Sequence, residues 1–186
     1  MTIAPHRTHL WLCALIAASA LFVPAHSSAQ GYPFSQRSTL TQSVALTDIT
    51  LTYGRPIARG RELFGHLVPW DSIWHPGADS ATRISFAHDV LIEGREVRAG
   101  DYSVWLVPRA HSAWTFILNG QARAFHKPYP GADKEVFRVD VMPESLSHME
   151  TMAIYFPVVR KDSAVMRIHW GTTSVPIRIT APFHPE

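Results

Sequence analysis

Cysteine is almost missing from this sequence of 186 residues, since the single cysteine is Cys13. A disulfide within the chain is therefore excluded, and no thiol lies beyond the first residues. Neither sign of charge is in large excess, because the sequence has 17 Lys and Arg residues and 15 Asp and Glu residues. Nucleic-acid binding needs a clustered basic face. We therefore expect no nucleic-acid partner.

Long apolar runs are also scarce: the sequence has a single one, from Leu10 to Val23. It follows a weakly basic start with Arg7 and precedes the small residues 27–29, which is the pattern of a secretory signal peptide. The run is shorter than the roughly 20 apolar residues that a spanning helix needs. We predict a signal peptide over residues 1–29 that is cleaved after Ala29; a buried N-terminal helix or a membrane anchor is the alternative. The mature chain is expected to be periplasmic or extracellular, with no transmembrane segment.

Beyond residue 42, apolar and polar residues alternate with the period of two that is typical of half-buried β-strands. Glu93-Gly94 and Asn119-Gly120 fall between such runs and predict hairpin turns. Strands of this kind must bury one face against another sheet. We predict an all-β fold over residues 43–182: a single-domain antiparallel β-sandwich of jelly-roll or immunoglobulin-like type. It should hold about nine strands and little helix, and a flattened barrel is the alternative. Residues 30–42 are predicted to form a flexible N-terminal segment.

The stretch from Tyr53 to Thr82 interrupts the alternation and predicts one long irregular loop rich in arginine, histidine and tryptophan. Loops on a rigid scaffold often carry binding residues. Arg55 and Arg61 suit paired hydrogen bonds to a carboxylate, phosphate or sulfate, or else they fasten the loop through its carbonyls. Trp74 and Trp105 suit stacking against a sugar ring, or else they pack in the core. Both interpretations of each pair remain open.

Catalytic motifs are not evident in the same stretch. His75 and Asp79 could act as a base and the group that orients it, but no serine is marked as a nucleophile. His66, His75, Asp79 and His88 have no spacing known for metal ligands. We therefore predict no metal and no cofactor, and we assign no catalytic residue.

A series of short motifs resembles a known family. The motifs are TLTYGRP at 50–56, LFG at 63–65, LVP at 67–69, AGDYS at 99–103 and WG at 170–171. In this order they resemble DUF2911, a family of unknown function, across roughly residues 43–180. The resemblance implies an exported bacterial domain, with no established activity, substrate or cofactor.

These observations favour a non-catalytic binding or cell-envelope-associated module with its ligand surface in the 53–82 loop. We expect a small anionic or carbohydrate-like ligand, and a protein of the envelope is a candidate partner. The alternative is a hydrolase or lyase that uses His75 and Asp79, with or without a metal. The predicted ligand-binding residues are Tyr53, Arg55, Arg61, Trp74, His75, Asp79 and Trp105.

Overall fold

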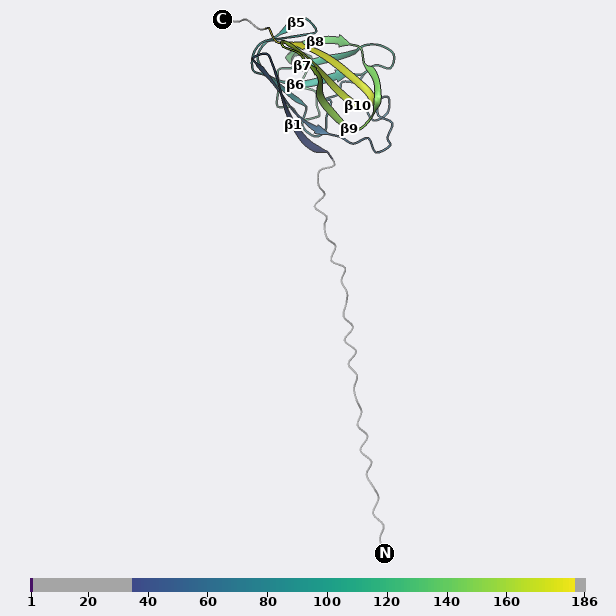
Figure 1. Cartoon of the computed structure of the whole chain (residues 1–186). Helices are drawn as coiled ribbons and strands as arrows, with labels where there is room; N and C mark the ends of the chain where they lie inside the picture. The colour runs from purple at the N-terminus through teal and green to yellow at the C-terminus, as the bar shows by residue number, and fades with distance from the viewer. Residues whose placement is uncertain (2–34, 183–186) are drawn as a thin grey trace. The chain divides into compact units, whose positions relative to one another are not determined.

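The structure is a computed structural model that describes Met1 and residues 35–182. Nearly all regular secondary structure of the described chain is β-strand (Figure 1). The strands are β1 (Gln36–Val44), β2 (Thr47–Arg55), β3 (Arg83–Phe86), β4 (Val90–Ile92), β5 (Arg95–Val97), β6 (Gly100–Val107), β7 (Trp114–Asn119), β8 (Glu135–Val141), β9 (Glu144–Val159) and β10 (Ser163–Thr180). One short 3₁₀ helix, η1 (Ala132–Lys134), precedes β8.

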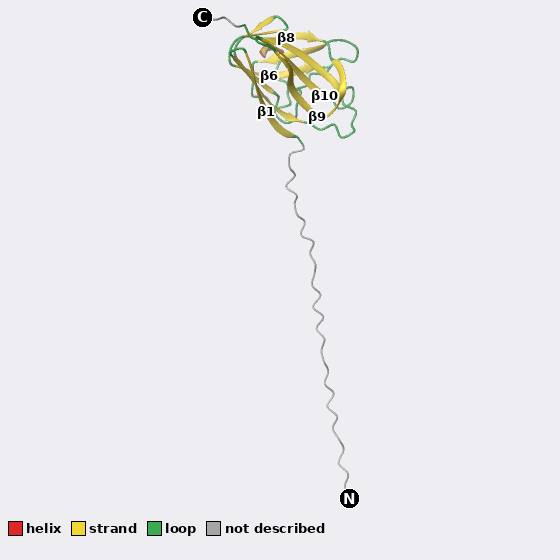
Figure 2. Ribbon diagram, viewed as in Figure 1, coloured by secondary structure: helices red, strands yellow, loops and turns green. Residues whose placement is uncertain are grey.

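The strands form two antiparallel sheets (Figure 2). The larger sheet has the order β1-β2-β3-β6-β7-β8, and the smaller sheet has the order β5-β4-β10-β9. One continuous core draws on both sheets, for example Leu51 and Phe116 from the larger sheet and Met152 and Ile177 from the smaller one. The predicted antiparallel sandwich is therefore confirmed, and the flattened barrel is not formed.

Side-chain alternation explains how each strand contributes to this core. Along β2 the odd-numbered residues Ile49, Leu51 and Tyr53 are buried, and the residues between them are more exposed. The two-residue turn Glu93-Gly94 joins β4 to β5, and both residues have positive φ, 47° and 78°. That backbone twist matches the twist of paired strands. The predicted hairpin at this position is confirmed.

Three details differ from the sequence-based expectations. Residues Gln36 to Gln42 were predicted to be flexible but lie in β1, an edge strand that pairs only with β2 and so needs few apolar residues. The alternation of apolar and polar residues also predicts that Leu46 shares a face with Val44, yet Leu46 is 72% exposed because it lies in the turn between β1 and β2. Asn119-Gly120 does not form a tight hairpin, because residues 120–134 separate β7 from β8. The predicted signal peptide lies outside the described residues.

The long loop is present and connects β2 to β3 across residues 56–82. It first crosses to the edge of the smaller sheet, where the Met152 N–H donates to the Pro56 carbonyl and the Ala58 N–H donates to the Glu150 carbonyl. It then returns to the larger sheet, where Trp74 and Leu106 exchange two backbone hydrogen bonds. The loop is therefore fastened to both sheets.

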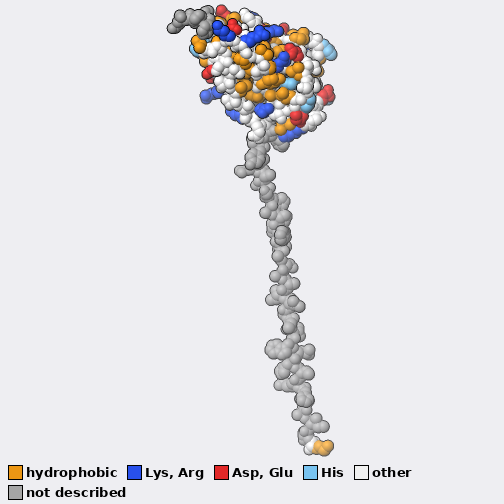
Figure 3. All heavy atoms as spheres, viewed as in Figure 1, with side chains coloured by type: hydrophobic (Ala, Val, Ile, Leu, Met, Phe, Trp, Pro, Cys, Tyr) orange, Lys and Arg blue, Asp and Glu red, His pale blue; other side chains and the backbone are white. Residues whose placement is uncertain are grey.

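The surface of the described chain is mixed. Figure 3 shows hydrophobic side chains gathered near the middle of the viewed face, with charged side chains mostly around them. Val158 and Val159 at the end of β9 are both 43% exposed. Among the described residues, none forms a helix with the length and hydropathy to cross a membrane.

Candidate functional site

The seven predicted ligand-binding residues lie in three separate places. Tyr53 and Arg55 face the smaller sheet: the Tyr53 hydroxyl accepts the Ile154 N–H at 2.9 Å, and the Arg55 Nε donates to the Met152 carbonyl at 3.0 Å. Both side chains therefore connect β2 to β9. For Arg55, the structure favours the interpretation that the guanidinium fastens the loop.

Arg61 also bonds to backbone carbonyls. Its Nε donates to the Ala58 carbonyl at 2.9 Å, and its Nη2 donates to the Ile57 carbonyl at 2.5 Å. These bonds close the turn after Pro56. Arg61 nevertheless stays exposed, and it lines a groove beside Trp74.

His75, Asp79 and Trp105 belong to the outer face of the larger sheet. Trp105 packs in the core, which is one of its two interpretations from sequence: it is 1% exposed in a small second core with Ile117 and Ala124. The cover is the loop of residues 120–134, which pairs with the 53–82 loop through Ala81 N–H and the Ala124 carbonyl at 3.0 Å. A ligand could reach Trp105 only if this cover moved.

His75 does not show the geometry of an oriented base. It is 6% exposed, and its Nδ1 has no hydrogen-bond partner in the described residues. Burial, with a smaller contribution from the neighbouring His126, lowers the pKa of His75 from 6.5 to about 4, and Asp79 opposes this shift. Asp79 is exposed at a positive φ of 64°, and no hydrogen bond joins it to His75.

A groove of about 520 Å³ brings together Arg61 and Trp74, two of the predicted residues. Trp170 lines the same groove, and its ring stacks on Trp74 with centroids 6.3 Å apart and planes 16° apart. Leu67, which is 45% exposed, lines another part of it. An adjoining hollow of about 350 Å³ shares Arg61 and Trp170. We name this surface the tryptophan groove.

An aromatic cluster supports the tryptophan groove from below. Phe64 lies at its centre, with ring centroids 4.8 Å from Trp114, 5.7 Å from Trp74, 6.3 Å from Trp70 and 6.4 Å from Trp170. The contact with Trp70 is stacked and the other three are edge-to-face, and both arrangements add to the stabilisation from apolar burial. The indole Nε1 of Trp170 is buried and has no hydrogen-bond partner in the described part of the chain.

Two glycines of the motifs allow the close packing around this cluster. A Cβ on Gly65 would lie 2.6 Å from the Trp70 Nε1, and a Cβ on Gly171 would lie 2.8 Å from the Leu63 Cδ1. Both glycines also have positive φ, 95° and 58°. The LFG motif and the WG motif therefore meet in space, although more than a hundred residues separate them in sequence.

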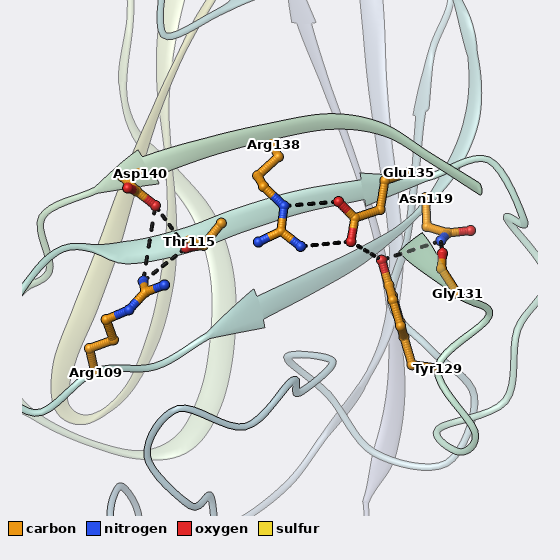
Figure 4. Close-up of polar contacts among 8 residues, drawn as sticks. All are labelled: Arg109, Thr115, Asn119, Tyr129, Gly131, Glu135, Arg138 and Asp140. Carbon is orange, nitrogen blue, oxygen red and sulfur yellow. Dashed lines mark hydrogen bonds and ion pairs between the residues drawn. The ribbon is translucent and has the colours of Figure 1, made fainter. Parts of the chain in front are cut away.

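A polar network fastens the loop of residues 120–134 to the larger sheet (Figure 4). Arg138 donates two hydrogen bonds to Glu135, and Tyr129 donates one to Glu135 at 2.6 Å. Burial and this carboxylate raise the pKa of Tyr129 to about 12. Asn119 donates to the Gly131 carbonyl at 2.9 Å, which explains why Asn119-Gly120 opens a long loop instead of a hairpin.

A second network lies further along β7 and β8 (Figure 4). Arg109 donates to the Thr115 hydroxyl at 2.8 Å, which in turn donates to Asp140 at 2.7 Å. The groups of both networks bond mainly to one another, so their role is to position the loops. Across residues 35–182, no group of three or more His, Cys, Asp or Glu side chains is arranged to hold a metal ion.

The fold and the loop together define an all-β sandwich domain with a structured excursion between its second and third strands. Its sequence matches the family model described as "Protein of unknown function (DUF2911)" over residues 35–179, so the chain belongs to that family. The resemblance in its motifs is thereby confirmed. No curated protein and no solved structure gives a significant match.

Trp170 and Arg59 are groove residues that the sequence did not predict. Trp170 alternates with polar residues in β10 on the same face as Met166 and Ile168, a pattern that predicts a core position, and it is only 3% exposed. Its part in the groove follows from the β2–β3 loop packing beside it, and no local sequence pattern indicates such a contact.

Proposed function

We propose that this protein is an exported, non-catalytic binding domain whose ligand occupies the tryptophan groove. The observation that carries the proposal is the convergence of Arg61, Trp74 and Trp170 on one groove of about 520 Å³. Ligand sites typically combine aromatic walls with a few polar groups that fix orientation. The 53–82 loop builds most of this groove and is itself held by both sheets, which supports a preformed site.

The chemistry of the groove favours a carbohydrate-like ligand. A sugar ring offers an apolar face for Trp74 and hydroxyl groups for hydrogen bonds. Arg59 and Arg61 lie at the groove as well, so sugars with carboxylate groups are expected to bind more tightly than neutral sugars. We propose short acidic oligosaccharides as the ligand class.

Binding is tested by calorimetry with trigalacturonate, cellohexaose and maltohexaose. We expect saturable binding that is tightest for trigalacturonate. Leu67→Asp places a negative charge in the groove, and its repulsion of the acidic ligand should abolish that binding. The core should be unaffected, because Leu67 is 45% exposed. The matched control is Ile73→Asp, since Ile73 is 37% exposed in the same loop and lines none of the cavities described here. Equal effects of the two substitutions, or no saturable binding of any sugar, would refute the proposal.

Export is a second part of the proposal, supported by the apolar run from Leu10 to Val23. N-terminal sequencing of the protein recovered from a bacterial periplasm or culture medium should give Gln30 as its first residue. Recovery of an uncleaved chain from the cytoplasm would contradict export. Association with an envelope protein is tested separately, by crosslinking in intact cells.

A further inference from the structure

A second cavity, of about 480 Å³, lies on the outer face of the larger sheet. Its floor comes from three neighbouring strands, with Arg37 on β1, Thr52 on β2 and Arg83 on β3. Its wall comes from Ser80 and from residues 122–125 of the loop that covers Trp105, including Arg123. We name it the arginine cavity. It shares no lining residue with the tryptophan groove.

The three guanidinium groups of the arginine cavity have no partner within the described residues. Among residues 35–182, no hydrogen bond or ion pair involves the side chains of Arg37, Arg83 or Arg123, and no residue of this range that lines the cavity is acidic. Four arginines elsewhere in the sandwich each have a carboxylate within 4.0 Å: Arg109, Arg138, Arg167 and Arg178.

The strand register shows that Arg83 is exceptional within its own row of residues. Thr39, Thr52, Arg83, Ser103, Asn119 and Glu135 lie opposite one another across all six strands of the larger sheet. The other members are hydrogen bonded: the two threonine hydroxyls lie 3.4 Å apart, and Ser103 accepts the Trp105 indole N–H at 2.9 Å. Asn119 and Glu135 belong to the network of the covering loop. Arg83 is the member left without a partner, and it lies where the row reaches the cavity.

We propose that the arginine cavity binds a small molecule with two or more negatively charged oxyanion groups. Guanidinium groups match the planar geometry of carboxylates and the oxygens of phosphates or sulfates, and they bind both in pairs of hydrogen bonds. Three uncompensated positive charges from three segments attract a multivalent anion more strongly than a monovalent one. The hydroxyl groups of Thr52 and Ser80 supply further donors at the same cavity.

The test is calorimetry on the full mature chain with citrate, pyrophosphate and sulfate at constant ionic strength, with chloride as the reference. We expect one-to-one saturable binding of citrate or pyrophosphate, and weaker binding of sulfate. Tighter binding of citrate would identify carboxylate as the preferred group, and tighter binding of pyrophosphate would identify phosphate. Arg83→Gln should weaken binding at least about tenfold, because a hydrogen bond to a charged group contributes about 1.5–3 kcal/mol.

Arg98→Gln is the matched control, because Arg98 is exposed and does not line the cavity. It should leave the affinity within about twofold of the wild type, since an exposed distant charge is largely screened by salt. Arg123→Gln lies in an exposed part of the covering loop and provides a second variant if Arg83→Gln impairs folding. The proposal is overturned if Arg98→Gln and Arg123→Gln lose equal affinity for the anion, or if none of the three anions shows saturable binding. Leu67→Asp, in the tryptophan groove, should not change anion binding, so the two sites fail or succeed independently.

Discussion

The phenol of Tyr53 bridges the two sheets by bonding to both backbone groups of Ile154. Its oxygen accepts the Ile154 N–H at 2.9 Å and its hydroxyl donates to the Ile154 carbonyl at 3.3 Å. Tyr53 begins the YGRP motif, and Arg55 of the same motif bonds to Met152 on the same strand. The motif therefore secures the point where the chain leaves the larger sheet for the edge of the smaller one.

Tyr53→Phe is expected to lower the free energy of unfolding by about 1–3 kcal/mol. The substitution keeps the ring but leaves buried backbone groups without their partner, which carries the cost of their desolvation. Urea unfolding followed by tryptophan fluorescence measures the change. Thr41→Val removes an exposed hydroxyl whose oxygen lies 3.0 Å from that of Thr50, and as a control it should change stability by less than about 0.5 kcal/mol. A Tyr53→Phe effect no larger than the control would show that the bridge is energetically neutral.

Gly54 explains why the YGRP motif needs a glycine. A Cβ at this position would lie 2.4 Å from the Ala78 carbonyl oxygen, which belongs to the returning part of the long loop. Gly54→Ala must therefore push that backbone away, and overpacking of this kind costs about 1–3 kcal/mol. Gly120→Ala is the control, because its Cβ would make ordinary contacts at 3.5 Å. We expect thermal unfolding to show a clear loss for Gly54→Ala, and similar melting temperatures for the two variants would contradict this.

The sequence predicted the sandwich well, because its strands bury one face and expose the other. Ile84 and Phe86 are buried in alternation, as expected for a strand packed on a second sheet. The same rule could not decide between the two interpretations of Trp105, since alternation reveals which residues share a face but not whether a distant loop covers that face. The 120–134 loop does so here, held by the hydrogen bonds of Asn119 and Tyr129.

The binding surfaces were harder to predict than the fold. The many arginines of the 53–82 stretch indicate a binding loop, yet Arg55 and Arg61 bond to backbone carbonyls. Arg37, Arg83 and Arg123 lie far apart in the sequence and meet only through strand register and loop packing. A single sequence contains no spacing that indicates such a meeting.

His75 makes stability depend on pH. Its pKa is lowered from 6.5 in the unfolded chain to about 4 in the folded chain, mainly by burial. Between these values the unfolded chain binds the proton and the folded chain does not, so the unfolding free energy rises with pH in this window. The contribution is fully present above pH 6.5 and is lost as the pH falls toward 4, by up to about 3 kcal/mol.

The His75→Gln variant isolates this contribution. Urea unfolding of wild type and variant should be measured at intervals from pH 4 to pH 7. We expect the wild type to lose more stability than the variant as the pH falls from 6.5 to 4. Parallel pH profiles would mean that His75 is not buried in its neutral form.

Trp114 and Trp170 form a matched pair that allows the energetic cost of an indole N–H without a hydrogen-bond partner to be measured. Both are almost fully buried in the cluster around Phe64, at 2% and 3% exposure. The Trp114 Nε1 donates to the Arg109 carbonyl at 2.9 Å, whereas the Trp170 Nε1 has no partner in the described chain. Replacement of either residue by Phe removes similar apolar area and leaves a similar void. The hydrogen bond is therefore the main difference between the two substitutions.

Trp114→Phe is expected to cost about 1 kcal/mol more than Trp170→Phe, because it loses a hydrogen bond and leaves a carbonyl with one partner fewer. Trp170→Phe removes a buried donor that was already unsatisfied, and this relief offsets part of the packing loss. Chemical denaturation of both variants in the same buffer gives the difference directly. An equal or larger cost for Trp170→Phe would show that its N–H has an acceptor in solution, such as a bound water.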